Sequence, residues 1–313
     1  MRRINFALII VMYCGILQSC AENPSCTENQ KKKRLFEHVV IIGIDGLTVD
    51  GLKQAETPVM DNLIANGAVK YNVRPVLPTS SLPNWGAMVF GAGPEATGIT
   101  SNGWQPDGQR MSPVVKNQAG LFPTIFDIVR EQLPEAEQGA FFEWSNIEYL
   151  IRKDVANRRE HYAPDDEVTR QVCSYITSKK PVFLFVQLSE VDYGGHGLGF
   201  QSTEYLQVVS KADGFVGRIM ESIRQSGMEN NTLVIVVSDH GGIGKGHGGE
   251  SVEESNVPYI YYGKGVKKNY TIQQAVYSYD VAANVAFALN LKTPYAWTGR
   301  PTLSAFEGYP EPE

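Results

Sequence analysis

The chain has 313 residues, of which 42% are hydrophobic and 20% are charged, as is typical of a folded globular protein with one large domain or two small ones. Its formal net charge is −6, and the short run from Lys31 to Arg34 is followed by no dense basic stretch. The composition therefore argues against a disordered chain, and the charge argues against duplex nucleic acid as a partner.

Residues 1–19 are typical of a signal peptide. Arg2 and Arg3 precede an apolar run from Phe6 to Leu17 that is too short to span a bilayer comfortably. The segment that ends at Cys20 is similar to a bacterial lipoprotein cleavage box, which predicts a lipid on Cys20 and attachment to a membrane. A simple secretory signal is the alternative. The sequence predicts export across the inner membrane of a bacterium, to a periplasmic or outer-membrane location.

Residues 20–36 are predicted to form a lipid-attached linker, because this stretch is polar and contains Pro24 and a basic cluster. Residues 37–313 are predicted to form a single domain. Only Cys26 and Cys173 could pair in an oxidising compartment. Because Cys26 lies in the predicted linker, we expect no disulfide framework.

From residue 38 onward, short apolar runs rich in β-branched residues alternate with helical patterns. This alternation predicts an α/β fold with a mainly parallel central sheet and helices on both faces. The predicted buried strands are Val39 to Ile44, Val182 to Leu188, Leu233 to Ser238 and Val257 to Tyr262. The predicted helices are Thr57 to Asn66, Thr124 to Gln132, Asp166 to Thr177, Ser202 to Gln225 and Asp280 to Leu289. The stretch from Gly103 to Pro164 has weaker periodicity, and we expect it to form a small cap-like excursion outside the sheet.

Acidic residues and histidines follow three of the predicted strands. They are Asp45 after the first, Asp192 and His196 after the second, and Asp239, His240 and His247 after the third. Ligands of an open α/β sheet gather at the carboxyl ends of its strands, so we expect these side chains to meet. Taken singly, each Asp is more often a turn or cap residue. Three of the five histidines, however, follow buried strands in Gly-rich loops near an Asp, which favours a metal site.

Carboxylate and imidazole ligands without thiolates suit zinc-like metals, and three Asp with three His would serve two ions. Two ions about 3.5 to 4 Å apart can clamp the attacking and leaving oxygens of a phosphoryl displacement. A nucleophile is expected in residues 76–85, where Thr79, Ser80 and Ser81 precede Pro83, a residue suited to the first turn of a helix. A hydroxyl there would lie near helix N-terminal amides, which attract phosphate; an N-cap serine without chemistry is the alternative.

Four motifs combine these features: Gly43-Ile44-Asp45-Gly46, Pro78-Thr79-Ser80-Ser81-Leu82-Pro83-Asn84, Asp192 with His196, and Ser238-Asp239-His240-Gly241. In this combination the chain resembles the type I phosphodiesterase and nucleotide pyrophosphatase branch of the alkaline phosphatase superfamily. The resemblance implies one alkaline-phosphatase-like catalytic domain over residues 37–313. It also implies that one metal is held by Asp192, His196 and His247, and the other by Asp45, Asp239 and His240. Ser81 would be the nucleophile and Asn84 a contact to a non-bridging phosphate oxygen, with Thr79 and Ser80 as alternative nucleophiles.

The implied activity is hydrolysis of a small phosphate ester, such as a nucleotide, through a phosphoserine and two zinc ions, with manganese as the alternative metal. The chain departs from the family at Ser81, where nucleotide-hydrolysing members usually have threonine, and at Trp85. Trp85, Trp104 and Tyr193 could stack on a base or an aryl leaving group, or else pack the rim of the site. A phosphomonoesterase, a sulfatase-like hydrolase and a non-catalytic surface lipoprotein are the alternatives.

Overall fold

A computed structural model of the protein describes residues 34–312, with the exception of residue 109. The predicted signal peptide, Cys20 and most of the predicted linker lie outside the described residues. Within the described part, no helix is both long enough and apolar enough to cross a membrane.

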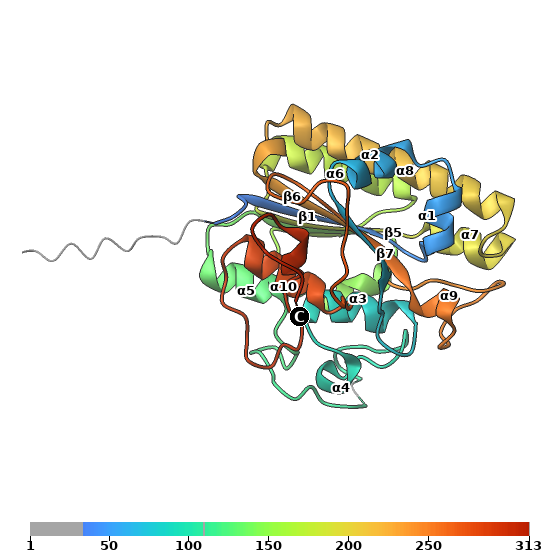
Figure 1. The fold of residues 1–313 in the computed structure, drawn as a ribbon. Helices are drawn as coiled ribbons and strands as arrows, with labels where there is room; N and C mark the ends of the chain where they lie inside the picture. Colours follow the sequence, from blue (N-terminus) through green and yellow to red (C-terminus); the bar gives the residue numbers. More distant parts are fainter. Residues whose placement is uncertain (1–33, 109, 313) are drawn as a thin grey trace, which may run out of the picture. The chain divides into compact units, whose positions relative to one another are not determined.

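The described residues form one eight-stranded sheet, in the order β4-β3-β5-β1-β6-β7-β2-β8 (Figure 1). The strands are β1 (His38–Ile44), β2 (Ala68–Val73), β3 (Gln138–Phe142), β4 (Arg158–His161), β5 (Phe183–Leu188), β6 (Thr232–Val237), β7 (Val257–Tyr262) and β8 (Tyr270–Thr271). The first five strands of this order are mutually parallel, whereas β7 runs antiparallel to both β6 and β2. The expected mainly parallel sheet is confirmed, with β7 as its reversed strand.

Helices cover both faces of the sheet. Figure 1 shows α1, α2, α6, α7 and α8 on one face, and α3, α5 and α10 on the other. The helices are α1 (Val49–Gln54), α2 (Pro58–Ala65), α3 (Ser81–Phe90), α4 (Pro94–Thr97), α5 (Ile125–Gln132), α6 (Asp165–Lys179), α7 (Glu190–Leu198), α8 (Thr203–Gln225), α9 (Val252–Ser255) and α10 (Asp280–Ala288), with 3-10 turns at Ser145–Leu150, Glu229–Asn231 and Leu303–Ala305. Successive side chains of β1 therefore enter different cores: Val39 and Ile41 enter one, Val40 and Ile42 the other.

The parallel register brings the ends of three strands to the same level. Gly43 of β1 is paired with Gln187 of β5 on one side and with Val237 of β6 on the other. The N–H of Asp45 continues this pairing, because it donates to the carbonyl of Leu188 at 2.9 Å. The residues that follow β1, β5 and β6 therefore emerge side by side at one edge of the sheet.

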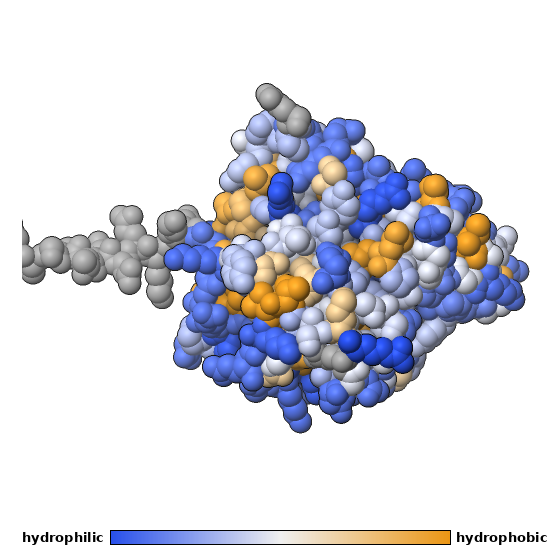
Figure 2. Space-filling view, turned by 90° about the horizontal axis from the view of Figure 1, so that it is seen from below, coloured by the Kyte–Doolittle hydropathy of each residue, from blue (hydrophilic) through white to orange (hydrophobic). Residues whose placement is uncertain are grey.

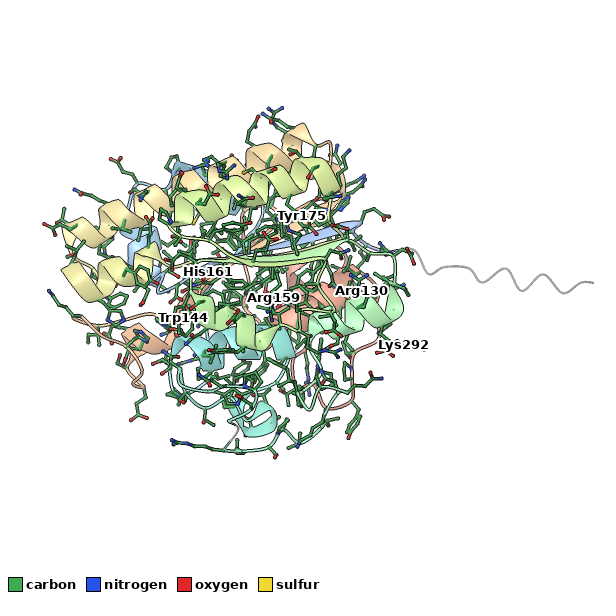
Figure 3. All side chains as sticks on the ribbon, turned by 180° about the vertical axis from the view of Figure 1, so that it is seen from behind. Arg130, Trp144, Arg159, His161, Tyr175 and Lys292 are labelled. Atoms are coloured by element: carbon green, nitrogen blue, oxygen red, sulfur yellow. The ribbon has the colours of Figure 1, made fainter. Side chains whose placement is uncertain are left out.

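The expected excursion over residues 103–164 is wrong in its second half, because β3 and β4 extend the sheet beyond β5. β3 has a weak strand signal because Gly139 makes room for Tyr175, whose Cε1 would lie 2.6 Å from a Cβ at this position. Figure 3 shows Tyr175 on the α6 side of the sheet and Arg130 on the α5 side. β4 is polar throughout, and as an edge strand it needs no apolar run.

The surface on the α4 side is mainly hydrophilic, and its apolar residues lie in separate groups (Figure 2). Exposed large apolar side chains of the described chain include Leu198, Ile243 and Val252. Such scattered apolar residues are ordinary for a globular protein, because there is too little polar surface to cover one completely.

Candidate active site

Two clusters of carboxylates and imidazoles form at the carboxyl ends of β1, β5 and β6. The first contains Asp45, Asp239 and His240, all of which are buried. The Nε2 atom of His240 lies 3.3 Å from Asp45 Oδ1 and 3.3 Å from Asp239 Oδ2. The N–H of Gly46 donates to the other oxygen of Asp239 at 3.1 Å, so Oδ2 is the oxygen available to a ligand.

The second cluster joins Asp192 and His196 of α7 with His247 of the loop after β6. The Nε2 atoms of His196 and His247 are 3.1 Å apart. Nε2 of His196 lies 3.5 Å from Asp192 Oδ2, and Nε2 of His247 lies 3.6 Å from Asp192 Oδ1. Asp192 and His196 are one turn apart on α7, so they face the same side of the helix. This segment is therefore a helix rather than the expected Gly-rich loop, and Gly195 in it makes room for the ring of Phe200.

Two groups of side chains have ligand atoms that all lie within 4.8 Å of one another, and each group could hold a metal ion: Asp45, Asp239 and His240, and Asp192, His240 and His247. His196 adjoins the second group, because its Nε2 contacts His247 and the other oxygen of Asp192. In a tetrahedral site with bonds of about 2.1 Å, neighbouring ligand atoms are about 3.4 Å apart. The separations between ligand atoms given above range from 3.1 to 3.6 Å. One oxygen of each carboxylate, namely Asp45 Oδ1, Asp192 Oδ1 and Asp239 Oδ2, is buried without a hydrogen-bond partner in the described structure. Buried oxygens of this kind call for a cation.

Each histidine of the clusters is oriented by the main chain. The Nδ1 atoms of His196, His240 and His247 contact the carbonyl oxygens of Lys245, Gly241 and Thr79 at 2.8–2.9 Å. A carbonyl can only accept, so the proton of each neutral ring lies on Nδ1. Nε2 is then left as the metal ligand, which is the usual division of roles in a histidine metal site.

Burial and mutual repulsion perturb the ionisation of the clusters. Burial, reinforced by the charge of Asp45, raises the pKa of Asp192 to about 6 and the pKa of Asp239 well above its usual range. Burial opposes the charged form of His240, but Asp239 and Asp45 raise its pKa to about 10. Burial and the charge of His240 lower the pKa of His247 to about 4. The site thus concentrates carboxylates away from water, and a divalent cation would neutralise them.

Ser81 lies beside the first cluster, at the start of α3. It follows the N-cap residue Ser80, and only 6% of its surface is exposed. Its Oγ is 3.1 Å from Nε2 of His240, the same atom that faces Asp45 and Asp239. The structure therefore brings the predicted nucleophile together with the first cluster and with the amides of a helix N-terminus.

Thr79, an alternative nucleophile in the sequence, makes structural contacts instead. Its hydroxyl donates to the carbonyl of Gly249 at 2.7 Å and accepts from the N–H of Gly248 at 3.0 Å. Its own carbonyl faces Nδ1 of His247 at 2.8 Å. Thr79 therefore joins the loop before Ser81 to the loop that carries a predicted metal ligand.

The surroundings of Asn84 differ from those that the resemblance implies. Its side chain is fully buried. Its amide group faces the carbonyls of Val76, Pro78 and Ser80 at 3.0–3.3 Å, and its Oδ1 accepts from the N–H of Val76 at 2.7 Å. These contacts use both amide hydrogens, so Asn84 shapes the loop before Ser81 and has no donor left for a phosphate oxygen.

Asn102, which no sequence pattern indicates, lies beside the nucleophile. Its Oδ1 accepts from the N–H of Leu82 at 2.8 Å, and its side chain is exposed. Its backbone carbonyl accepts from the side-chain amide of Asn146 at 3.3 Å. Asn102 comes from the irregular segment between α4 and α5, where no periodic pattern could indicate its position.

Two of the three aromatic residues expected at the rim are buried. Trp85 is fully buried and donates through its indole N–H to Asp45 Oδ2 at 3.0 Å, and Trp104 lies in the hydrophobic core. Neither ring can present a face to a substrate, because core packing covers it. Tyr193 is 50% exposed, and its hydroxyl donates to Glu143 at 2.7 Å.

Comparison with known sequences gives a consistent family. A family model described as type I phosphodiesterase / nucleotide pyrophosphatase matches residues 39–244. Human bis(5'-adenosyl)-triphosphatase ENPP4 is 24% identical over 248 residues, which cover 75% of this chain and 52% of that protein. Human ectonucleotide pyrophosphatase/phosphodiesterase family member 1 is 27% identical over 194 residues, which cover 59% of this chain and 21% of that protein. The chain thus spans about half the length of the first relative and less of the second.

Solved structures show the same fold. An inactive variant of murine ectonucleotide pyrophosphatase / phosphodiesterase 5 in complex with AMP aligns with a TM-score of 0.69 and 18% identity, covering 82% of this chain and 96% of that chain. A 2-O GAG sulfatase aligns with a TM-score of 0.72 and 15% identity, covering 89% of this chain and 76% of that chain.

Proposed function

Because the chain belongs to the type I phosphodiesterase / nucleotide pyrophosphatase family, we propose that it hydrolyses phosphodiesters or nucleotide pyrophosphates with Ser81 as its nucleophile. The observation that carries this proposal is the position of the Ser81 Oγ, 3.1 Å from Nε2 of His240 and beside the buried oxygens of Asp45 and Asp239. A relative with AMP bound supports a nucleotide as the substrate class.

We assign the two clusters to two divalent metal ions, zinc by ligand chemistry, with manganese as the alternative. One ion would be held by Asp45, Asp239 and His240, and the other by the second cluster. When bound, the ions would supply Lewis-acid activation of the hydroxyl and stabilisation of negative charge.

The residues of the chain provide the nucleophile and its orientation. The Ser81 hydroxyl loses its proton to solvent, and its oxygen bonds to phosphorus while the bond to the leaving-group oxygen breaks, which gives a phosphoserine that keeps the other ester group of the substrate. Water then attacks phosphorus and the bond to the Ser81 oxygen breaks, so that Ser81 regains a proton and a phosphomonoester departs. The N-terminal position of Ser81 on α3 directs main-chain dipoles at the phosphate throughout.

In place of Asn84, we assign the contact to a non-bridging phosphate oxygen to Asn102. The bond from the N–H of Leu82 fixes its Oδ1 next to the nucleophile, and its Nδ2 is then oriented away from that bond. An amide donor aimed at the developing charge stabilises it more in the transition state than in the substrate.

The test compares hydrolysis of an aryl phosphodiester, the matching phosphomonoester and the matching sulfate by the soluble mature chain with Zn²⁺. Ser81→Ala should lower turnover at least about a thousandfold, while two ions still bind. Ser80→Ala is the matched control and should retain activity. A diester preference that disappears only in Ser81→Ala supports the proposal. Preference for the monoester or the sulfate, or inactivity on all three with two ions bound, contradicts it.

We also propose that a lipid on Cys20 anchors the protein at a membrane, as a periplasmic or outer-membrane lipoprotein. Its support is the sequence around Cys20 alone, since these residues lie outside the described part. Expression in a bacterial host should give a mass increase from acylation and recovery in the membrane fraction. Cys20→Ala should abolish both, and an unmodified wild-type chain would contradict the anchor.

A further inference from the structure

The carboxylate of Asp45 has one satisfied oxygen and one free oxygen. Its Oδ2 accepts from the indole N–H of Trp85 and from the side-chain amide of Gln187, both at 3.0 Å. Its Oδ1 has no hydrogen-bond donor and lies 3.3 Å from His240 Nε2. Two side chains outside the proposed chemistry therefore decide which oxygen of Asp45 faces the first cluster.

The orientation of Gln187 is determined by four contacts. Its amide group donates to Asp45 Oδ2 and to the hydroxyl of Ser189, the latter at 2.8 Å. Its Oε1 accepts from the backbone N–H groups of Glu143 and Trp144, at 3.2 and 3.0 Å. A flipped amide would set its oxygen against a carboxylate and its N–H groups against two donors. Gln187 is fully buried, so it can only present its donor to Asp45.

The position of Trp85 depends on a glycine in β1. A Cβ at Gly43 would lie 2.6 Å from Cζ3 of the Trp85 ring, so no side chain fits between the strand and the indole. The ring also packs edge-on against Phe185, with centroids 5.9 Å apart. Gly43 lies in β1 two residues before Asp45, which directly follows the strand, so the space beside Gly43 allows the indole to reach the carboxylate.

Trp85 also connects the metal ligand to the nucleophile. It lies four residues after Ser81 on α3, which places it one turn along the same face of the helix. We propose that Trp85 and Gln187 are positioning residues that hold Asp45 as a ligand through one oxygen, and that Trp85 also sets α3 and Ser81 against that ligand. This inference rests on the proposed assignment of the first cluster to a metal ion.

The test measures Zn²⁺ affinity by competition with a chromophoric chelator, and the visible spectrum of the Co²⁺ form. Trp85→Phe keeps a ring in the space left by Gly43 but removes the donor, and Gln187→Met removes the other donor at similar volume. Each should weaken one of the two ions about 10- to 100-fold and change the Co²⁺ spectrum. Trp85→Phe should also lower kcat more than it changes KM.

Trp297→Phe is the matched control, because its indole N–H donates to the carbonyl of Pro123 at 3.1 Å, a partner that belongs to neither cluster. It should leave both ion affinities and the Co²⁺ spectrum unchanged. Wild-type affinity and spectrum in both Trp85→Phe and Gln187→Met would overturn the inference. The metal measurements need no substrate, so a wild-type protein that binds two ions but hydrolyses no ester would contradict only the proposed reaction.

Discussion

Replacing Asn84 with alanine should damage the fold of the site rather than its contact with phosphate. The change removes the bonds to the N–H of Val76 at 2.7 Å, to its carbonyl at 3.2 Å and to the carbonyl of Ser80 at 3.0 Å. Each such bond contributes about 1 kcal/mol net, so the free energy of unfolding should fall by about 3 kcal/mol. That loss corresponds to a melting temperature lower by about 6 to 12 °C in a domain of this size.

Replacing Asn102 with alanine should have the opposite pattern. Its side chain is exposed and makes one bond to the N–H of Leu82, so the free energy of unfolding should change by less than about 1.5 kcal/mol. If its amide contacts the phosphate, turnover should fall about a hundredfold or more.

The assay combines thermal unfolding of both zinc-loaded variants with kcat on an aryl phosphodiester. An Asn84→Ala variant that melts like the wild type but loses turnover about a hundredfold would contradict both expectations. That result would return the phosphate contact to Asn84, as the family resemblance implies.

Three further outcomes are expected. Thr79→Val should lower the free energy of unfolding by about 1 to 3 kcal/mol, because it removes two buried hydroxyl contacts. The control is Thr177→Val, because the exposed hydroxyl of Thr177 bonds to carbonyls of its own helix. Equal urea midpoints for the two variants would contradict a structural role for the Thr79 hydroxyl. A chelator should lower the calorimetric melting temperature and Zn²⁺ should restore it, because the cluster carboxylates are buried close together; an unchanged temperature would argue against bound metal. Burial raises the pKa of Asp165 to about 7, above its unfolded value, so the stability it contributes is complete below about pH 4 and is lost as the pH rises through 7. Asp165→Asn should therefore flatten the dependence of urea stability on pH in that window, and an equally steep dependence would contradict the shift.

The residues of the two clusters could be predicted from the sequence because they follow apolar runs. β1, β5 and β6 are buried on both faces, so each run is continuous and its end is sharply marked. Parallel strands in register then bring those ends together, as the pairing of Gly43 with Gln187 and Val237 shows. Proximity of the six side chains follows from topology alone, without knowledge of any side-chain contact.

The hydrogen-bond partners of Asn84 and Asn102 depend instead on the path of irregular segments. Such segments have no periodic pattern of apolar residues from which their path could be predicted. Asn84 follows the predicted nucleophile closely and would be expected near phosphate, yet the backbone of residues 76–80 turns back over its carboxamide. Asn102 lies beside Leu82 only because the segment after α4 returns to the start of α3. Neither arrangement has a local cause that composition or spacing could reveal.

Glycines in two buried strands weaken the sequence pattern that predicts a strand, because an aromatic ring from another element occupies the space beside each of them. Gly139 weakens β3 and makes room for Tyr175, and Gly43 interrupts the apolar run of β1 and makes room for Trp85. Neither glycine has the positive φ that would explain it by backbone conformation. Gly43 lies two residues before Asp45, and the ring that occupies its space supplies a donor to that carboxylate.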